Sequence, residues 1–215
     1  MTGEEIRRGE LLSRINNVLV QGGLAGQSMA SLAKAVGVSR GKLYVYFANR
    51  KEVVGAVVDQ YRELAADQMA TPSAPWTVEA LPQWLLAAVL VLASCSPVLL
   101  ADMTRAYPDE RQRVADAQHQ FEERFAAYLN EGVANGTFHT IDIPLFLAMI
   151  QASVAGLNHP ERIGRAGAKP VIKHLVRILT LVLLDEAAAK RLLTQERTQR
   201  AVTALAGELT LRYQH

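Results

Sequence analysis

The sequence of 215 residues contains a single cysteine, Cys95, and no proline before Pro72. One cysteine excludes an intramolecular disulfide framework and a multi-cysteine zinc site, and it is typical of a reducing compartment. No apolar run reaches the roughly 18 residues that a transmembrane helix needs. The first ten residues, MTGEEIRRGE, are too polar for a signal peptide. We therefore expect a globular cytoplasmic protein that does not span a membrane.

Net charge is also small, at +2 from 23 basic and 21 acidic residues, and by itself does not indicate a nucleic-acid partner. The distribution of charge says more than the total. Residues 28–51 hold five of the basic residues and no acidic one. The rest of the chain keeps 18 basic and all 21 acidic residues, which leaves it slightly negative. The balanced total therefore conceals a local basic cluster.

Apolar residues recur at helical spacing, and prolines and glycines separate the helical segments. We expect the fold class to be all-α, with a break between two units at the sequence TPSAP, residues 71–75. The helices are expected at about 4–21, 28–36, 39–47, 50–69, 84–95, 109–134, 143–157 and 170–184, and the tail 186–213 is helix-prone. This pattern predicts a first domain over 1–70 and a second domain over 71–215.

The two short helices at 28–36 and 39–47 are separated only by Gly37, Val38 and Ser39. Such a tight turn is typical of a helix-turn-helix, whose second helix enters the major groove of DNA. At 100° per residue, Leu43 and Phe47 share one face of that second helix, which we expect to be buried. The other positions form a candidate DNA-reading face flanked by two tyrosines: Gly41, Lys42, Val45, Tyr44 and Tyr46.

Each residue type on this face suits a groove. A lysine donates to guanine acceptors, a valine contacts a thymine methyl, glycine admits close backbone approach, and tyrosines bond phosphates. We expect Tyr44 to lie nearer the buried face than Tyr46. Ser28 is expected to cap the first short helix, and Asn49 with Glu52 resembles a capping box. Helix N-termini attract phosphate, and Arg50 adds a full positive charge at one of them.

The stretch AVGVSRGKLYVYFANRKEV resembles the DNA-binding domain of the TetR family of bacterial regulators, with the match running from Glu10 to Val58. The family pattern has Gly-Val-Ser, a basic residue, Gly, any residue, and then Leu-Tyr-x-Tyr-Phe. Departures from it are Ala30 and Ser31 in place of a frequent Arg-Asp pair, and Val45 in place of a common His. The resemblance and the helical wheel together give these candidate DNA-binding residues: Ser28, Ser39, Arg40, Gly41, Lys42, Tyr44, Val45, Tyr46 and Arg50.

The resemblance implies that the second domain binds a small molecule and forms a homodimer. Large side chains there could line a ligand cavity or simply form the core: Trp84, Met103, Tyr107, Phe121, Phe125, Tyr128, Phe146 and Met149. A dimer seam would use helices 143–157 and 170–184, through Leu145, Met149, Leu175, Ile178, Leu179 and Val182. Equal numbers of basic and acidic residues over 71–215 indicate no strongly charged ligand.

No pattern of residues indicates catalysis, a cofactor or a metal site. His119 with Glu122 and Glu123 has ligand spacing, but a solvated charged face explains it better, and Cys95 is expected to be a small buried hydrophobe. The sequence thus predicts a cytoplasmic DNA-binding transcriptional regulator, a repressor released from a palindromic operator by a hydrophobic or amphipathic ligand. Three alternatives stay open: an interaction protein on DNA without an inducer, an activator, and an all-α enzyme.

Overall fold

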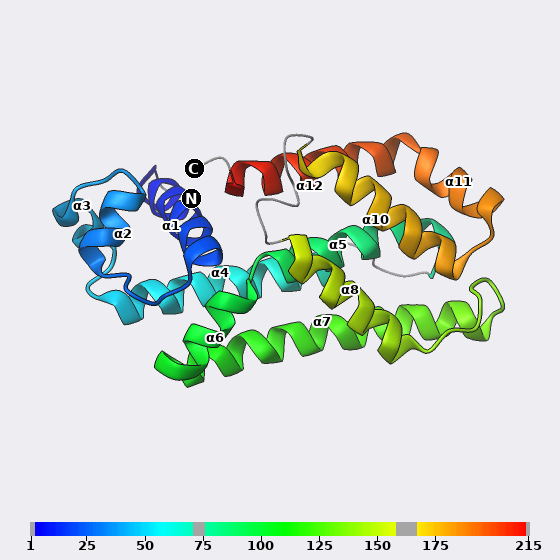
Figure 1. The fold of residues 1–215 in the computed structure, drawn as a ribbon, viewed down its shortest axis with the longest axis horizontal. Coiled ribbons are helices and arrows are strands. Elements are labelled where there is room, and N and C mark those ends of the chain that lie inside the picture. The colour runs from blue at the N-terminus through cyan, green and yellow to red at the C-terminus, as the bar shows by residue number, and fades with distance from the viewer. Residues whose placement is uncertain (1–2, 71–75, 158–166, 214–215) are drawn as a thin grey trace. The chain divides into compact units, whose positions relative to one another are not determined.

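The computed structural model describes residues 3–70, 76–157 and 167–213 (Figure 1). Over these ranges the chain forms helices and no strand, which confirms the all-α prediction. A short 3₁₀ helix, η1, covers Val78–Ala80. The α-helices are α1 (Gly3–Gly22), α2 (Met29–Ala35), α3 (Arg40–Tyr46), α4 (Arg50–Ala70), α5 (Leu81–Ala93), α6 (Pro97–Ala106), α7 (Pro108–Ala134), α8 (Ile143–Leu157), α10 (Ala168–Leu183), α11 (Glu186–Thr194) and α12 (Glu196–Tyr213).

Most of the expected helices have bounds within a few residues of the prediction, and the helix-prone segment 186–213 is helical. The chain forms two helices there, because Gln195 takes an extended ψ of 136° and ends α11. Asp185 begins this segment by accepting a hydrogen bond from the backbone N–H of Ala188 at 2.8 Å. The predicted break at 71–75 and most of the loop expected at 156–169 lie outside the described residues.

The chain divides into two compact units that are not continuous in sequence. Unit 1 comprises Met1–Leu64 and Ser94–Ala117, and unit 2 comprises Ala65–Ala93 and Gln118–His215. Helices α4 and α7 each contribute residues to both units. The functional boundary expected near residue 70 stays a prediction, and the packing of 94–117 with the N-terminal segment adds a part that the sequence did not assign to it.

Unit 1 is organised around α1, which packs against α2 and α6. Its buried side chains follow the apolar stripes of the helices, as amphipathic helices require. The fully buried ones include Ile15, Leu19, Leu24, Leu32, Leu43, Phe47, Val53, Val54, Val58 and Leu99. This core fixes the two short helices α2 and α3 at the surface of the unit (Figure 1).

Unit 2 is organised around α5, which contacts α8, α10 and α12. Ten of its thirteen residues are buried, as expected for a helix that is apolar on nearly every side. In the described part of the chain, no single helix is long and apolar enough to cross a membrane. One consecutive pair, Val78–Ala93 with Pro97–Ala106, meets that criterion only when the two are taken together across a bend.

Candidate functional site

The helix-turn-helix of unit 1 forms as predicted, and its caps are visible in detail. Ser28 makes a capping box with Ser31: the Ser31 backbone N–H donates to the Ser28 hydroxyl at 3.1 Å, and the Ser28 N–H donates to the Ser31 hydroxyl at 2.7 Å. Ser39 caps α3 by accepting from the Lys42 backbone N–H at 3.1 Å. Local polar bonds therefore define where both helices begin.

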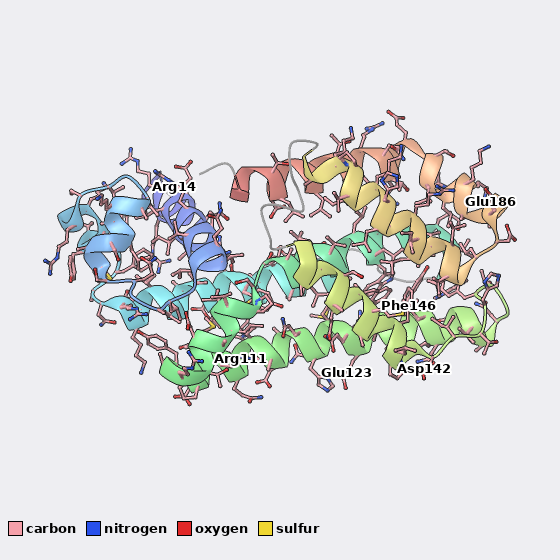
Figure 2. All side chains as sticks on the ribbon, in the orientation of Figure 1. Arg14, Arg111, Glu123, Asp142, Phe146 and Glu186 are labelled. Carbon is pink, nitrogen blue, oxygen red and sulfur yellow. The ribbon has the colours of Figure 1, made fainter. Side chains whose placement is uncertain are left out.

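The turn between α2 and α3 depends on Gly37, whose φ of +69° is a left-handed conformation that favours glycine. A Cβ at this position would lie 3.2 Å from an Nη2 of Arg14. Figure 2 labels Arg14 on α1, so the first helix brings a guanidinium to the turn. Gly37 thus supplies both the reversal of the chain and the room for this contact.

The two faces of α3 differ as the helical wheel predicts. Leu43 and Phe47 are fully buried, whereas Val45 is 68 % exposed. Gly41 has no neighbouring atom within 4 Å of the place where a Cβ would be, and Lys42 is exposed. The structure therefore leaves α3 with a small, open and partly apolar outer face.

The placement of the two tyrosines corrects one prediction. Tyr44 is 41 % exposed and Tyr46 is only half-buried, so Tyr44, not Tyr46, is the more open of the two. Tyr46 is the last residue of α3 and directly precedes the buried Phe47. Its ring is also covered by Lys42, whose Nζ lies 5.3 Å from the ring centre. Arg40 covers Tyr44 in the same way at 5.4 Å, and its guanidinium lies 3.5 Å from the Tyr44 hydroxyl.

Arg50 is engaged inside unit 1. Its guanidinium donates to the backbone carbonyl of Leu24, and its Cζ lies 5.8 Å from the ring centre of Tyr107. Asp102 on α6 completes this arrangement by accepting from the backbone N–H groups of Leu24 at 2.7 Å and of Ala25 at 2.9 Å. These two bonds are the main reason why the pKa of Asp102 is lowered. Nothing in the sequence marks Asp102 as the residue that holds the turn after α1.

The start of α4 carries a modified form of the predicted capping box. The Asn49 side chain accepts from the Glu52 backbone N–H at 3.0 Å, as expected. The Glu52 carboxylate, however, accepts from the N–H of Ala48 at 2.7 Å and not from that of Asn49. These two side-chain bonds fix the start of α4.

Four of the predicted ligand residues form a ring cluster in unit 2. Trp84 stacks on Phe125 with ring centres 5.4 Å apart, and it contacts Phe121 at 5.9 Å and Tyr128 at 5.6 Å. Burial raises the pKa of Tyr128 well above its usual value. All four are buried, so in this structure they pack as core.

The remaining predicted ligand residues do not join this cluster as a group. Met103 and Tyr107 belong to unit 1, apart from the other predicted ligand residues, and their ligand role stays a prediction. Phe146, labelled on α8 in Figure 2, is buried in unit 2, whereas Met149 is 48 % exposed. Their apolar character alone could not show which of these residues lie in the core of unit 2, which are exposed and which belong to unit 1.

The predicted seam residues on α8 and α10 divide by exposure. Leu145 and Ile178 are each 59 % exposed and Met149 is 48 % exposed, while Leu175 and Val182 are half-buried. Leu179 is the exception, because it lies with Ile172, Val176 and Leu183 on the buried stripe of α10. Its assignment to an open seam is therefore corrected.

A cavity that the sequence did not indicate lies in unit 2 between α10, α11 and α12. Its volume is about 580 Å³, and none of the eight predicted ligand residues lines it. Among the described residues no group of three or more His, Cys, Asp or Glu could hold a metal ion. His119 and Glu123 form an exposed pair at 3.3 Å. Cys95 is buried as predicted, and burial raises its pKa to about 12, which disfavours a reactive thiolate.

Comparison with known proteins supports the geometry of unit 1. Residues 11–57 match the family model of bacterial regulatory proteins of the tetR family. Comparison with curated proteins gives no match.

Solved structures share the fold. The ketosteroid transcriptional regulator KstR2 of Mycobacterium tuberculosis is 22 % identical, with a TM-score of 0.60 over 84 % of this chain and 96 % of that one. The TetR family regulator PfmR of Thermus thermophilus is 21 % identical, with a TM-score of 0.57 over 80 % and 94 %. AibR in complex with isovaleryl coenzyme A and operator DNA is 15 % identical, with a TM-score of 0.61 over 80 % and 97 %. Residues 11–57 thus form a DNA-binding helix-turn-helix of the tetR family type, and the chain shares the all-α fold of these solved regulators.

Proposed function

We propose that the chain is a repressor whose α3 reads a palindromic operator in the major groove of double-stranded DNA. The observation that carries this proposal is the outer face of α3, where Val45 is 68 % exposed beside an open Gly41 and an exposed Lys42. Lys42 would donate to guanine acceptors and Val45 would contact a thymine methyl. Tyr44, held by Arg40, would bond a phosphate at the edge of the groove.

The contacts in unit 1 refine the proposed phosphate set. Arg50 is already used by the Leu24 carbonyl and the Tyr107 ring, so we assign it the positioning of the turn before α2, with phosphate contact as a second role. Ser28 and Ser39 offer the N-termini of α2 and α3, where backbone N–H groups and the helix dipole favour phosphate. The six remaining reading residues keep the roles that the sequence predicts.

We further propose a homodimer through α8 and α10. Six large apolar side chains stay exposed among the described residues, and three of them, Leu145, Met149 and Ile178, lie on these two helices. Exposed large apolar side chains on two helices of one unit support a partner surface there. A symmetric dimer would place its two α3 helices about 34–36 Å apart, one turn of DNA.

The effector is proposed to be a small hydrophobic or amphipathic molecule bound in unit 2. The AibR structure holds both isovaleryl coenzyme A and operator DNA, so a protein of this fold binds a small molecule as well as DNA. Helices α4 and α7 each contribute to both units, so a shift in either one links a ligand in unit 2 to the reading helix. The ligand must favour the state that does not fit the operator.

The proposed function is binding, carried out in the cytoplasm, and not catalysis. The interaction protein without an inducer, the activator and the all-α enzyme are less well supported. The cavity in unit 2 favours a ligand-responsive regulator over a closed interaction protein. An activator would share the same DNA contacts, because its effect depends on where the operator lies.

Selection of bound duplexes from a random pool tests the proposal. We expect enrichment of one palindrome, occupied by two chains as measured by sedimentation of the complex. Ile178→Glu places a charge in the seam and should give a monomer that binds the same duplex far more weakly. Lys190→Glu, an exposed change outside the seam, should leave the dimer intact. Absence of any enriched sequence would contradict DNA reading, and enrichment with one chain per site would contradict the dimer.

A further inference from the structure

We propose that the cavity between α10, α11 and α12 binds an amphipathic anion, a molecule with a carboxylate or phosphate head and a short apolar body. The three helices lie together at the C-terminal end of the chain (Figure 1), and α10 packs against both α11 and α12. The cavity volume of about 580 Å³ lies within the range of small-molecule sites. This inference concerns binding alone and does not rest on the proposed repression.

Positive charge gathers around the cavity. Lys173 and Arg177 lie one turn apart on α10, and Lys190 faces the same cavity from α11. Glu186 is the one acidic residue of the lining, and it begins α11 beside the turn at Asp185. In the part of the chain that the structure describes, none of the three cations lies within 4.0 Å of a carboxylate. Three cations around one cavity repel one another, and a bound anion offsets this repulsion.

The walls of the same cavity are apolar. Val176 and Val202 come from the buried faces of α10 and α12, and Ala189 and Leu193 come from α11. An apolar wall with charged groups at one side fits a ligand that has a charged head and an apolar body. Free inorganic anions would use only the cations and would leave this wall in contact with water.

Thr198 supplies a second, independent observation. It lines the cavity, it is fully buried, and its Oγ1 has no hydrogen-bond partner. A buried hydroxyl without a partner is costly, and most such groups in proteins are bonded. A polar head that enters between α10 and α12 gives this hydroxyl its missing partner. The neutral total charge of residues 71–215 concealed this site, much as the total charge of the chain concealed the basic cluster at 28–51.

Calorimetric titration of the full chain with three probes tests the inference. Octanoate and octyl phosphate share the proposed chemistry, and 1-octanol has the same apolar body without charge. We expect at least one of the two anions to bind at least about tenfold more tightly than the alcohol, as the loss of a charged hydrogen bond implies. The anion that binds more tightly shows whether the cavity prefers a carboxylate or a phosphate head. Binding of the alcohol as tight as that of both anions, or no binding of either anion, would overturn the inference.

Two variants locate the site. Lys173→Gln should weaken binding of the better anion about tenfold, whereas Lys169→Gln, on the same helix but outside the lining, should change it little. Thr198→Val keeps the shape and removes the unpaired hydroxyl, so it should keep or raise the melting temperature while it weakens binding. Unchanged binding in both Lys173→Gln and Thr198→Val would overturn the proposed location.

Discussion

The interactions inside unit 1 differ in kind from those inside unit 2. In unit 1, polar contacts fix the geometry: Asp102 holds the turn at Leu24 and Ala25, and Arg113 binds Asp59 and Glu110. In unit 2 the central contacts are between rings, with Trp84 against Phe125 and Tyr128. Polar contacts have direction and specify position, whereas ring packing mainly supplies buried area. We infer that changes in unit 2 cost more stability, while changes in unit 1 cost more function.

The largest expected effect is the loss of the central ring. Trp84→Ala should lower the free energy of unfolding by about 3–5 kcal/mol, because it leaves a cavity between Phe125 and Tyr128. Trp84→Phe should cost clearly less, since it keeps a ring and removes an indole N–H that has no partner. Urea denaturation followed by circular dichroism measures both. If Trp84→Ala lowers the free energy of unfolding no more than Trp84→Phe does, the packing of this ring does not stabilise unit 2 as proposed.

A glycine pair tests the packing of unit 2 at one atom. A Cβ at Gly132 would lie only 2.1 Å from the Phe138 ring, so Gly132→Ala should lower the free energy of unfolding by about 1–3 kcal/mol. At Gly207, also within a helix, nothing lies within 4 Å, so Gly207→Ala should raise it by up to about 1 kcal/mol. Equal effects of the two substitutions in urea denaturation would show that the Phe138 ring does not pack tightly against Gly132 of α7.

A second glycine pair tests the polar contacts of unit 1. Gly23 and Gly26 both have a positive φ, of +71° and +72°, so alanine is strained at either by about 1–2 kcal/mol. Only at Gly23 would a Cβ collide, lying 2.5 Å from an Asp102 carboxylate oxygen and 2.8 Å from Val98. Gly23→Ala should therefore weaken DNA binding more than Gly26→Ala does. Fluorescence anisotropy with the selected duplex measures both affinities. Equal losses of affinity would show that the contact of Gly23 with α6 does not affect DNA binding.

The smallest expected effect is a pH dependence through Asp102. Its pKa is lowered in the folded chain, so its contribution to stability is present above the unfolded value of about 3.9 and is lost as pH falls below it. Asp102→Asn should be less stable than the wild type at neutral pH, and the difference should shrink under acid conditions. Asp116→Asn, an exposed control in unit 1, should show no such trend. Urea denaturation at several pH values measures the stability of each variant relative to the wild type. If the difference between Asp102→Asn and the wild type does not change with pH, the charge of Asp102 does not contribute to stability.

Much of unit 1 could be predicted, because its signals are local in sequence. The Gly37 turn, the Ser28 and Ser39 caps and the buried pair Leu43 and Phe47 each follow from residues within one or two turns. The contact of Asp102 with Leu24 could not be predicted, because 78 residues separate the two partners. The inward turn of Arg50 toward the Leu24 carbonyl has the same cause.

In unit 2 the helices could be predicted and the binding surfaces could not. An apolar side chain at helical spacing gives the same pattern whether it joins a core, as Leu179 does, or stays exposed, as Ile178 does. The break at Gln195 carries no proline or glycine, so nothing in the sequence marks where the helix-prone segment 186–213 divides into two helices. That break creates α11 and with it the cavity between α10 and α12.

The most direct test of the account compares Lys42→Ala with the wild type on the selected duplex and on a scrambled one, at fixed salt. We expect the variant to lose about 1–3 kcal/mol of binding free energy on the selected duplex. On the scrambled duplex it should lose no more than Lys51→Ala, which removes an exposed charge at the start of α4. Equal losses of Lys42→Ala on the two duplexes would contradict the central claim that the outer face of α3 reads the bases.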